Sequence, residues 1–349
     1  MDGLAAAAVA AVPPAVSLPH VQRAVHEQFG LVGTYRPLIS ERDQNFRLTT
    51  ASGADYVVKV TSSAEPPLVS DFQIAGLLHL EQSETAVPRV IRTLKGNVSG
   101  HLESGQQDYR LRVVSYVPGA ELASLAVTSH LAFDFGARLA HLDAQLGDFA
   151  HPGDRPTLLW DLQRALELRE LLDHIDDTEV RRPVEQALHD YEEFVAPHVA
   201  QLRTQVIHGD ANPGNVIVDP VDLKISGFID FGDMVRAPLI FDVAIAAAYL
   251  RGSDARALEL VAPFIDGYNH VVPLQALEQT LLFDLIRARL ATTITLLYWR
   301  LGARPGDDPY REKTLKEEAD AVRFLGALDS LGRAGFRERI AARVGRRTV

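Results

Sequence analysis

A polar run in the middle of the chain, HGDANPGN at residues 208–215, places the carboxylate of Asp210 shortly before the amide of Asn215. A second carboxylate, Asp230, begins the triplet DFG that follows. Phosphoryl transfer needs an acceptor hydroxyl that is held and deprotonated, and phosphate charge that is neutralised by magnesium ions and a lysine. We therefore expect Asp210 to be the catalytic base. Asn215 and Asp230 would offer Mg²⁺ the hard oxygen ligands that it prefers.

The sequence between these groups predicts how they meet. Residues 216–218 are apolar and β-branched, residues 219–222 have the composition of a turn, and residues 224–229 can return as a second strand. Because a hairpin brings its two ends together, we expect Asn215 and Asp230 to lie side by side.

The order H-x-D-x-x-x-x-N followed by D-F-G resembles the catalytic loop and the metal-binding triplet of protein kinases. A simpler alternative is a Gly, Pro and Asn-rich turn in which Asp210 and Asn215 only cap backbone groups. The predicted hairpin and the triplet directly after it favour the kinase interpretation.

An upstream strand-like run, DYVVKV at residues 55–60, carries a single lysine among β-branched residues. It resembles the kinase strand whose lysine binds the α- and β-phosphates, so we predict this role for Lys59. Apolar spacing predicts a helix over residues 68–82, packed behind the lysine. Kinases place a glutamate on that helix to hold the lysine, whereas this chain offers Gln73 or Asp71.

Two further segments are predicted to contact ATP. No glycine-rich phosphate loop is present, so Ser40, Arg42 and Asn45 in residues 38–46 are the expected phosphate contacts, although a polar hairpin turn explains them nearly as well. Residues 112–119 indicate a strand that ends in a turn. The backbone at Ser115 and Val117 would then pair with adenine as an inter-lobe hinge.

Four sequence pieces, VVKV, SYVPG, HGDANPGNVIVD and GFIDFGDM, are together similar to the aminoglycoside phosphotransferase and choline kinase family. The resemblance covers residues 38–249. The outer pieces SERDQNF and RLATTITLLYWRLGARPGDDPY look most like the hydroxylysine kinase subgroup. The resemblance implies an ATP-dependent kinase that uses Mg²⁺ and phosphorylates a hydroxyl group, with Asp242 bracing the catalytic loop.

The same resemblance implies an α+β, protein-kinase-like bilobal fold, with a small β-rich N-lobe and a larger, mainly helical C-lobe. We assign residues 1–17 to a disordered lead-in, 18–115 to the N-lobe, 116–119 to the hinge and 120–349 to the C-lobe. Apolar residues at three- and four-residue spacing predict C-lobe helices over residues 131–146, 158–174, 180–203 and from 240 to about 343.

The segment after Gly232 bears on the substrate. Residues 233–239 lead directly into an apolar helix-like run, which leaves no room for the long activation segment on which a peptide would lie. This favours a small hydroxylated molecule, and a hydroxylated amino acid or an amino alcohol is our first expectation. Aminoglycosides, hydroxyacyl-CoA and a non-catalytic nucleotide-binding role are the alternatives.

Substrate contacts are harder to assign than the phosphate site. Trp160, Asp161 and Asp233 could hold an amine through cation–π contact and charge pairing. Arg287 and Arg289 could hold a carboxylate. The alternative for each of these residues is a packed or surface position on a helix. Among the twelve histidines only His208 attracts a function, as a support for the catalytic loop.

Composition restricts the partners. A formal net charge of −11 argues against nucleic acid or an anionic membrane surface, both of which need basic patches. Cysteine is absent, which excludes disulfides and thiolate chemistry. The Ala-rich start lacks the positive charge of a signal peptide, so we expect cytoplasmic residence. We expect the protein to be a monomer or a homodimer.

Overall fold

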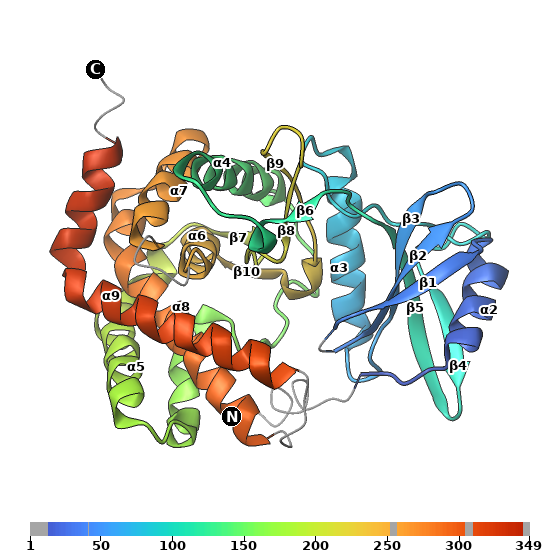
Figure 1. The fold of residues 1–349 in the computed structure, drawn as a ribbon, viewed down its shortest axis with the longest axis horizontal. Coiled ribbons are helices and arrows are strands. Elements are labelled where there is room, and N and C mark those ends of the chain that lie inside the picture. The colour runs from blue at the N-terminus through green and yellow to red at the C-terminus, as the bar shows by residue number, and fades with distance from the viewer. Residues whose placement is uncertain (1–12, 41, 252–256, 304–309, 345–349) are drawn as a thin grey trace. The chain divides into compact units, whose positions relative to one another are not determined.

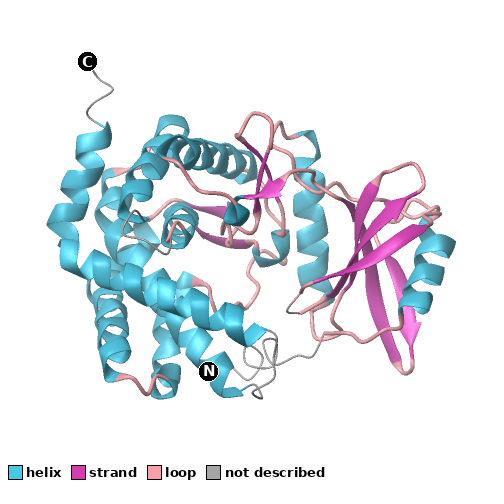
Figure 2. Cartoon of the chain, viewed as in Figure 1, coloured by secondary structure: helices cyan, strands magenta, loops and turns pink. Residues whose placement is uncertain are grey.

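The chain forms two compact units in a computed structural model that describes residues 13–40, 42–251, 257–303 and 310–344. The first unit contains the chain up to Pro118 together with residues 149–157, and the second contains residues 119–148 and those from 158 onward. Strands dominate the first unit and helices the second (Figure 1, Figure 2). The predicted α+β class, with a β-rich first part and a mainly helical second part, is confirmed.

A five-stranded antiparallel sheet of order β1-β2-β3-β5-β4 builds the first unit. Its strands are β1 (Gly33–Leu38), β2 (Gln44–Thr50), β3 (Asp55–Val60), β4 (Gly100–Ser104) and β5 (Gln107–Ser115). In the register of β3 and β5, Lys59 lies opposite Arg112. The predicted strand around the lysine is therefore an inner strand of the sheet.

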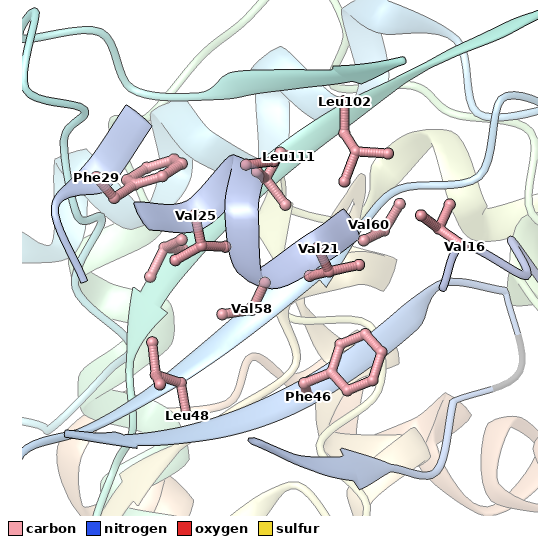
Figure 3. Packing of buried hydrophobic residues seen from close by; sticks show 12 residues of the cluster. Val16, Val21, Val25, Phe29, Phe46, Leu48, Val58, Val60, Leu102 and Leu111 are labelled. Carbon is pink, nitrogen blue, oxygen red and sulfur yellow. The ribbon is translucent and has the colours of Figure 1, made fainter. Parts of the chain in front are cut away.

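The two faces of this sheet have different partners because side chains alternate along each strand. Val58 and Val60 belong to an apolar core that also contains Val21 and Val25 of helix α2 (Leu18–Phe29), as Figure 3 shows. Burying such side chains stabilises the fold by about 1.5–3 kcal/mol each. Lys59 points to the opposite face.

Helix α3 (Pro67–His79) and the 3₁₀ turn η1 (Leu80–Gln82) match the helix predicted over residues 68–82. Pro67 lies in the first turn, where its missing N–H costs no hydrogen bond. The ring of Phe72 on α3 stacks on Phe149 at 5.8 Å between centroids. This contact is one reason why residues 149–157 belong with the first unit.

The structure describes only the last part of the predicted lead-in, residues 13–17. Residues 1–12 of the predicted lead-in lie outside the described residues. Val16, by contrast, is buried, and its backbone N–H donates to the side-chain oxygen of Gln44 at 3.0 Å.

Short strands in the second unit carry the polar motifs. The strands are β6 (Ala120–Glu121), β7 (Thr204–Ile207), β8 (Val216–Val218), β9 (Ile225–Phe228) and β10 (Val235–Pro238). β8 and β9 form the predicted antiparallel hairpin, with Val216 opposite Phe228. β7 pairs with β10, so the segments before and after the hairpin are also held together.

The second unit is otherwise helical. Its elements are α4 (Ser129–Leu146), η3 (Leu162–His174), α5 (Thr178–Asp190), α6 (Leu239–Tyr249), α7 (Ala257–Val271), α8 (Ala276–Ala303) and α9 (Tyr310–Val344). α4 and α7 cross closely at Gly136 and Gly267, where an added Cβ would collide with the facing backbone. α8 packs against η3, α5, α6 and α9.

Two predicted helices differ in detail. Residues 162–174 form a 3₁₀ helix rather than an α-helix. The helix predicted over residues 180–203 is α-helical only to Asp190, and it continues as the π turn Tyr191–Val195 and the 3₁₀ turn Ala196–Gln201. Pro197 explains this break, because proline has no N–H to continue an α-helical ladder. No helix in the described part of the chain is both long and apolar enough to span a membrane.

Candidate active site

Helix α6 and the neighbouring strands hold the loop between β7 and β8, residues 208–215, in place. The carboxylate of Asp242, on α6, accepts the backbone N–H groups of His208 at 3.1 Å and Gly209 at 2.9 Å. Gly209 has φ of 76°, and a Cβ there would collide with the backbone oxygen of Asp233. The fully buried ring of His208 reaches the carbonyl oxygen of Ile229 at 3.0 Å. These contacts fix the direction in which the next residue, Asp210, points.

Two amide side chains hold the carboxylate of Asp210. The Nδ2 group of Asn215 donates to Oδ2 of Asp210 and to its backbone oxygen, both at 2.9 Å. Asn212 donates to the same carboxylate oxygen at 2.9 Å. Asn212 lies within the same sequence motif, but its residue type alone did not indicate this role. Both amides therefore orient Asp210.

Asn215 and Asp230 are neighbours across the open end of the hairpin, as predicted. The N–H of Ile229, the residue before Asp230, donates to the carbonyl oxygen of Asn215 at 2.9 Å. Asp230 itself has φ of 60°, a left-handed conformation that is uncommon outside glycine and gathers at functional sites. Because the nitrogen of the Asn215 amide is turned to Asp210, its carbonyl oxygen faces away. This geometry fits a metal ligand.

Charge around Asp210 is mixed. Burial and the nearby Asp233 carboxylate raise the pKa of Asp210 to about 8, whereas Arg289 and Asn212 act in the opposite direction. General acids and bases work best with a pKa near the pH at which the enzyme operates. The arrangement therefore suits a general base.

Arg289 provides the positive charge beside Asp210. It extends from α8 with 3% of its surface exposed, and its Nη2 lies 3.6 Å from Oδ1 of Asp210. Its Nη1 donates to the carbonyl oxygen of Trp160 at 2.7 Å, and Nη2 donates to the hydroxyl of Tyr249 at 3.2 Å. Of the residues predicted to contact the substrate, Arg289 thus lies beside Asp210, and the backbone of Trp160 lies beside Arg289.

Arg287 is not brought to this neighbourhood. Two residues along an α-helix turn the side chain by about 200°, so Arg287 and Arg289 leave opposite faces of α8. Arg287 is buried in an ion cluster, where its Nε donates to Asp329 at 2.7 Å and its Nη1 to Asp190. Asp190, Asp284, Asp329, Arg287 and Arg333 make up this cluster.

Asp161 has a local structural role. Its carboxylate accepts the N–H of Gln163 at 2.9 Å, which caps the start of η3, and it also accepts the Gln163 side chain at 3.0 Å. Its burial raises its pKa. Both carboxylate oxygens of Asp161 are therefore engaged in capping η3, and these are the atoms with which it would hold an amine.

In the first unit, Lys59 has a carboxylate partner that we did not predict. Its Nζ lies 3.9 Å from Oδ2 of Asp43, in the turn between β1 and β2. Of the two predicted partners, Asp71 pairs with Arg110 at 2.7 Å on the outside of α3. Gln73 is buried and accepts a hydrogen bond from Arg112 at 2.6 Å.

The other predicted nucleotide contacts also lie in the first unit. Ser40 caps the turn, since its hydroxyl accepts the N–H of Asp43 at 3.3 Å, and Arg42 lies in the same turn. Asn45 lies opposite Lys59 in the register of β2 and β3. Its buried Oδ1 has no hydrogen-bond partner among the described residues, which leaves it available to a donor.

The residues of the predicted hinge differ in whether their backbone N–H groups already make hydrogen bonds. The backbone N–H of Ser115 already donates to Arg89 at 2.8 Å, and that of Tyr116 donates to Asp55 at 3.1 Å. Val117 is the predicted hinge residue that lacks such a bond within the described chain. A cavity of about 170 Å³ adjoins it on the side of α3, bounded also by Leu80 and Val87. Ligand pockets are usually larger, at roughly 300–1,000 Å³.

Comparison with known proteins identifies the family. The sequence profile of the Phosphotransferase enzyme family matches residues 34–283. The chain belongs to this family. It is 28% identical over 334 residues to hydroxylysine kinase of Danio rerio, covering 92% of this chain and 93% of that protein. It is 29% identical over 243 residues to homoserine kinase of Neisseria meningitidis serogroup B, covering 68% and 73% respectively.

Solved structures of kinases confirm the predicted protein-kinase-like fold. The amicoumacin kinase hAmiN, solved with AMP-PNP, Ca²⁺ and Ami, superposes with a TM-score of 0.67 at 16% identity, covering 91% of this chain and 95% of that one. Together with the family match and the named relatives, the predicted class of activity is confirmed: this member of the phosphotransferase family is a small-molecule kinase that acts on hydroxyl groups.

Proposed function

We propose that this kinase transfers the γ-phosphate of ATP to the hydroxyl group of a hydroxylated amino acid resembling hydroxylysine. The observation that carries the proposal is the set of charges beside the expected base. The carboxylates of Asp210 and Asp233 and the guanidinium of Arg289 interact with one another within the second unit. Such a site offers both an anion and a cation to a substrate that bears an ammonium and a carboxylate. The named relatives, hydroxylysine kinase and homoserine kinase, support the same substrate class.

Each side chain then has a separate part in the reaction. Asp210 orients the acceptor hydroxyl and takes up its proton, and Asn212 and Asn215 keep the carboxylate aimed. Asp233 pairs with the substrate ammonium, and Arg289 attracts the substrate carboxylate while it limits the negative charge at Asp210.

The residues present fit a divalent cation and a nucleotide. Asn215 and Asp230 would hold Mg²⁺ through one amide and one carboxylate oxygen, with the remaining positions left to water and phosphate, as is usual for Mg²⁺. Lys59, Ser40, Arg42 and Asn45 would contact the phosphates, and Val117 the adenine. The bound cation supplies charge neutralisation for the transferred phosphoryl group.

The test measures phosphorylated product from a panel of acceptors with ATP and Mg²⁺. The panel contains 5-hydroxylysine, homoserine, 1-amino-2-propanol, an aminoglycoside and a hydroxyacyl-CoA. We expect the hydroxylated amino acids to give the highest kcat/KM. Asp210→Asn should lower kcat about 10²- to 10⁴-fold, the usual share of a general base.

Arg289→Gln provides the specific check on the substrate class. It should raise KM for 5-hydroxylysine more than for 1-amino-2-propanol, because the amino alcohol has no carboxylate to lose a contact. An equal effect on both acceptors would remove the carboxylate from the proposal. Preference for the aminoglycoside or the acyl-CoA would replace the substrate class altogether.

A further inference from the structure

Asp43 occupies an unusual position in the first unit, because one oxygen of its carboxylate lies near two cations. Its Oδ2 is 3.4 Å from Nη2 of Arg112 and 3.9 Å from Nζ of Lys59. Its Oδ1 accepts the backbone N–H of Ser62 at 3.1 Å. The side chain is buried, so the position of this carboxylate is fixed from three sides.

Arg112 is the more firmly held of the two cations. It is 6% exposed and lies opposite Lys59 across β3 and β5. Its Nε donates to the hydroxyl of Thr61 at 3.0 Å, and its Nη1 donates to the side-chain oxygen of Gln73 at 2.6 Å. Arg112 therefore joins the sheet, helix α3 and the turn that carries Asp43.

The helix side of this network is also satisfied. The amide nitrogen of Gln73 donates to Glu65 at 3.1 Å, and the hydroxyl of Ser70 donates to the other oxygen of Glu65. Oε1 of Glu65 lies 3.9 Å from Nη2 of Arg112. A planar guanidinium with several fixed donors is suited to such a junction, whereas a lysine ammonium on a flexible stem can change partners.

We propose that Asp43 is a positioning residue for Lys59: it holds the ammonium group in place while Lys59 binds the nucleotide phosphates, and Arg112 shares in neutralising the Asp43 carboxylate. The proposal rests on the function proposed above for Lys59. A buried carboxylate that loses its only cation is strongly unfavourable. Because Arg112 also contacts Asp43, the carboxylate stays neutralised while Lys59 shares its ammonium with the phosphates. On this proposal, the carboxylate that positions the lysine comes from the turn between β1 and β2.

The chain offers a matched control in the same strand and helix. Arg110 on β5 pairs with Asp71 on α3 at 2.7 Å, but this ion pair is partly exposed, and it is separate from the Asp43 carboxylate. Arg110→Gln removes a link between the same two elements without touching the proposed network.

The experiment measures the Kd of Mg·ATP by calorimetry, with KM for ATP and for the acceptor, in Asp43→Asn, Lys59→Met, their double variant and Arg110→Gln. We expect Asp43→Asn to weaken ATP binding about tenfold, which corresponds to about 1.4 kcal/mol, with the KM of the acceptor unchanged. Arg110→Gln should bind ATP as the unaltered protein does. The double variant should be no weaker than Lys59→Met alone, because the two residues act through one contact.

The outcomes separate the two proposals. Unchanged ATP binding in Lys59→Met would overturn the function proposed for that lysine, and with it this inference. Weakened binding in Lys59→Met with unchanged binding in Asp43→Asn, or with effects that multiply in the double variant, would overturn the inference alone. Thermal melting without nucleotide shows whether each variant folds. If Asp43→Asn does not fold, Asp43→Glu serves instead, because it keeps the charge and displaces it, and a smaller weakening of ATP binding is expected.

Discussion

Asp143 of α4 is a carboxyl group buried completely beneath the catalytic loop. The hydroxyl of Tyr268 donates to its Oδ2 at 2.6 Å, whereas no N–H or O–H group of the described chain donates to its Oδ1. Burial raises the pKa of Asp143 well above the usual range, and the nearby Asp242 carboxylate raises it further. Because burial disfavours the charged form, Asp143 holds its proton in the folded protein.

This proton makes stability depend on pH. An unfolded aspartate has a pKa of about 3.9, so above that pH the folded protein holds a proton that the unfolded chain has lost. The free energy of unfolding therefore falls as pH rises from about 4 toward the raised pKa of Asp143. Asp143→Asn keeps a polar group that can accept the hydrogen bond from Tyr268 but carries no titrating proton. We expect its thermal midpoint, relative to the unaltered protein, to be higher at pH 8 than at pH 5.

Asp143→Ala is the control for that measurement. It leaves the buried hydroxyl of Tyr268 without its acceptor, so its midpoint should be lower at both pH values. A difference between Asp143→Asn and the unaltered protein that stays constant with pH would show that Asp143 is ionised in the folded state.

Groupings of site residues were predictable from the sequence where local structure makes them, and not where long-range packing makes them. Asp210, Asn215 and Asp230 could be grouped from sequence because a short hairpin joins them, and this grouping is local. Arg287 and Arg289 were equivalent candidates, and only the packing of α8 separates them. Asp43 and Arg112 are far apart in the chain, and nothing in the residues alone indicates that they meet.

At the scale of elements, the ion cluster of Arg287 ties α8 to the end of α5 and to α9. Burial would raise the pKa of Asp190, but hydrogen bonds from Arg287 and Gln186 outweigh it and lower that pKa. Arg287→Met removes one cation from among three carboxylates. We expect it to lower the free energy of unfolding by about 3–5 kcal/mol, the usual effect of breaking a buried ion pair, as measured by urea denaturation followed by circular dichroism.

Arg181→Gln gives the matched comparison. Arg181 on α5 contacts Asp173 and Glu185, but these ion pairs lie at the surface. Its loss should leave the urea midpoint unchanged, because exposed ion pairs contribute little. Equal effects of the two substitutions would mean that the buried cluster does not hold the helices together.

Elements with a strong local signal were predictable, and those that depend on packing were not. The β-branched run at residues 216–218 and the apolar spacing of α4 each predict the element that forms. Residues 162–174 have helical spacing as well, yet they form a 3₁₀ helix. Periodicity counts apolar positions, and it does not distinguish three residues per turn from 3.6 over a short segment.

For the whole molecule, the sequence predicted the class of fold and of activity more fully than it predicted the contacts within the site. The family resemblance extends over most of the chain, and the family match over residues 34–283 agrees with it. Substrate choice is decided by a few side chains, which a fold shared among many kinases does not determine.

A ligand that binds only the folded protein stabilises all of it, by about 2.7 kcal/mol at a concentration near 100 times its Kd. Mg·ATP should therefore raise the thermal midpoint of this kinase, and calorimetric scans with and without the nucleotide measure the shift. Lys59→Met and Asp230→Asn should each remove most of it, since we assign one to phosphate and the other to Mg²⁺. Asparagine tolerates the left-handed backbone at position 230, so that variant isolates the charge. Asp210→Asn should retain the shift, because Asp210 is assigned to the acceptor and not to the nucleotide. A shift lost in Asp210→Asn and kept in Asp230→Asn would reverse the two assignments.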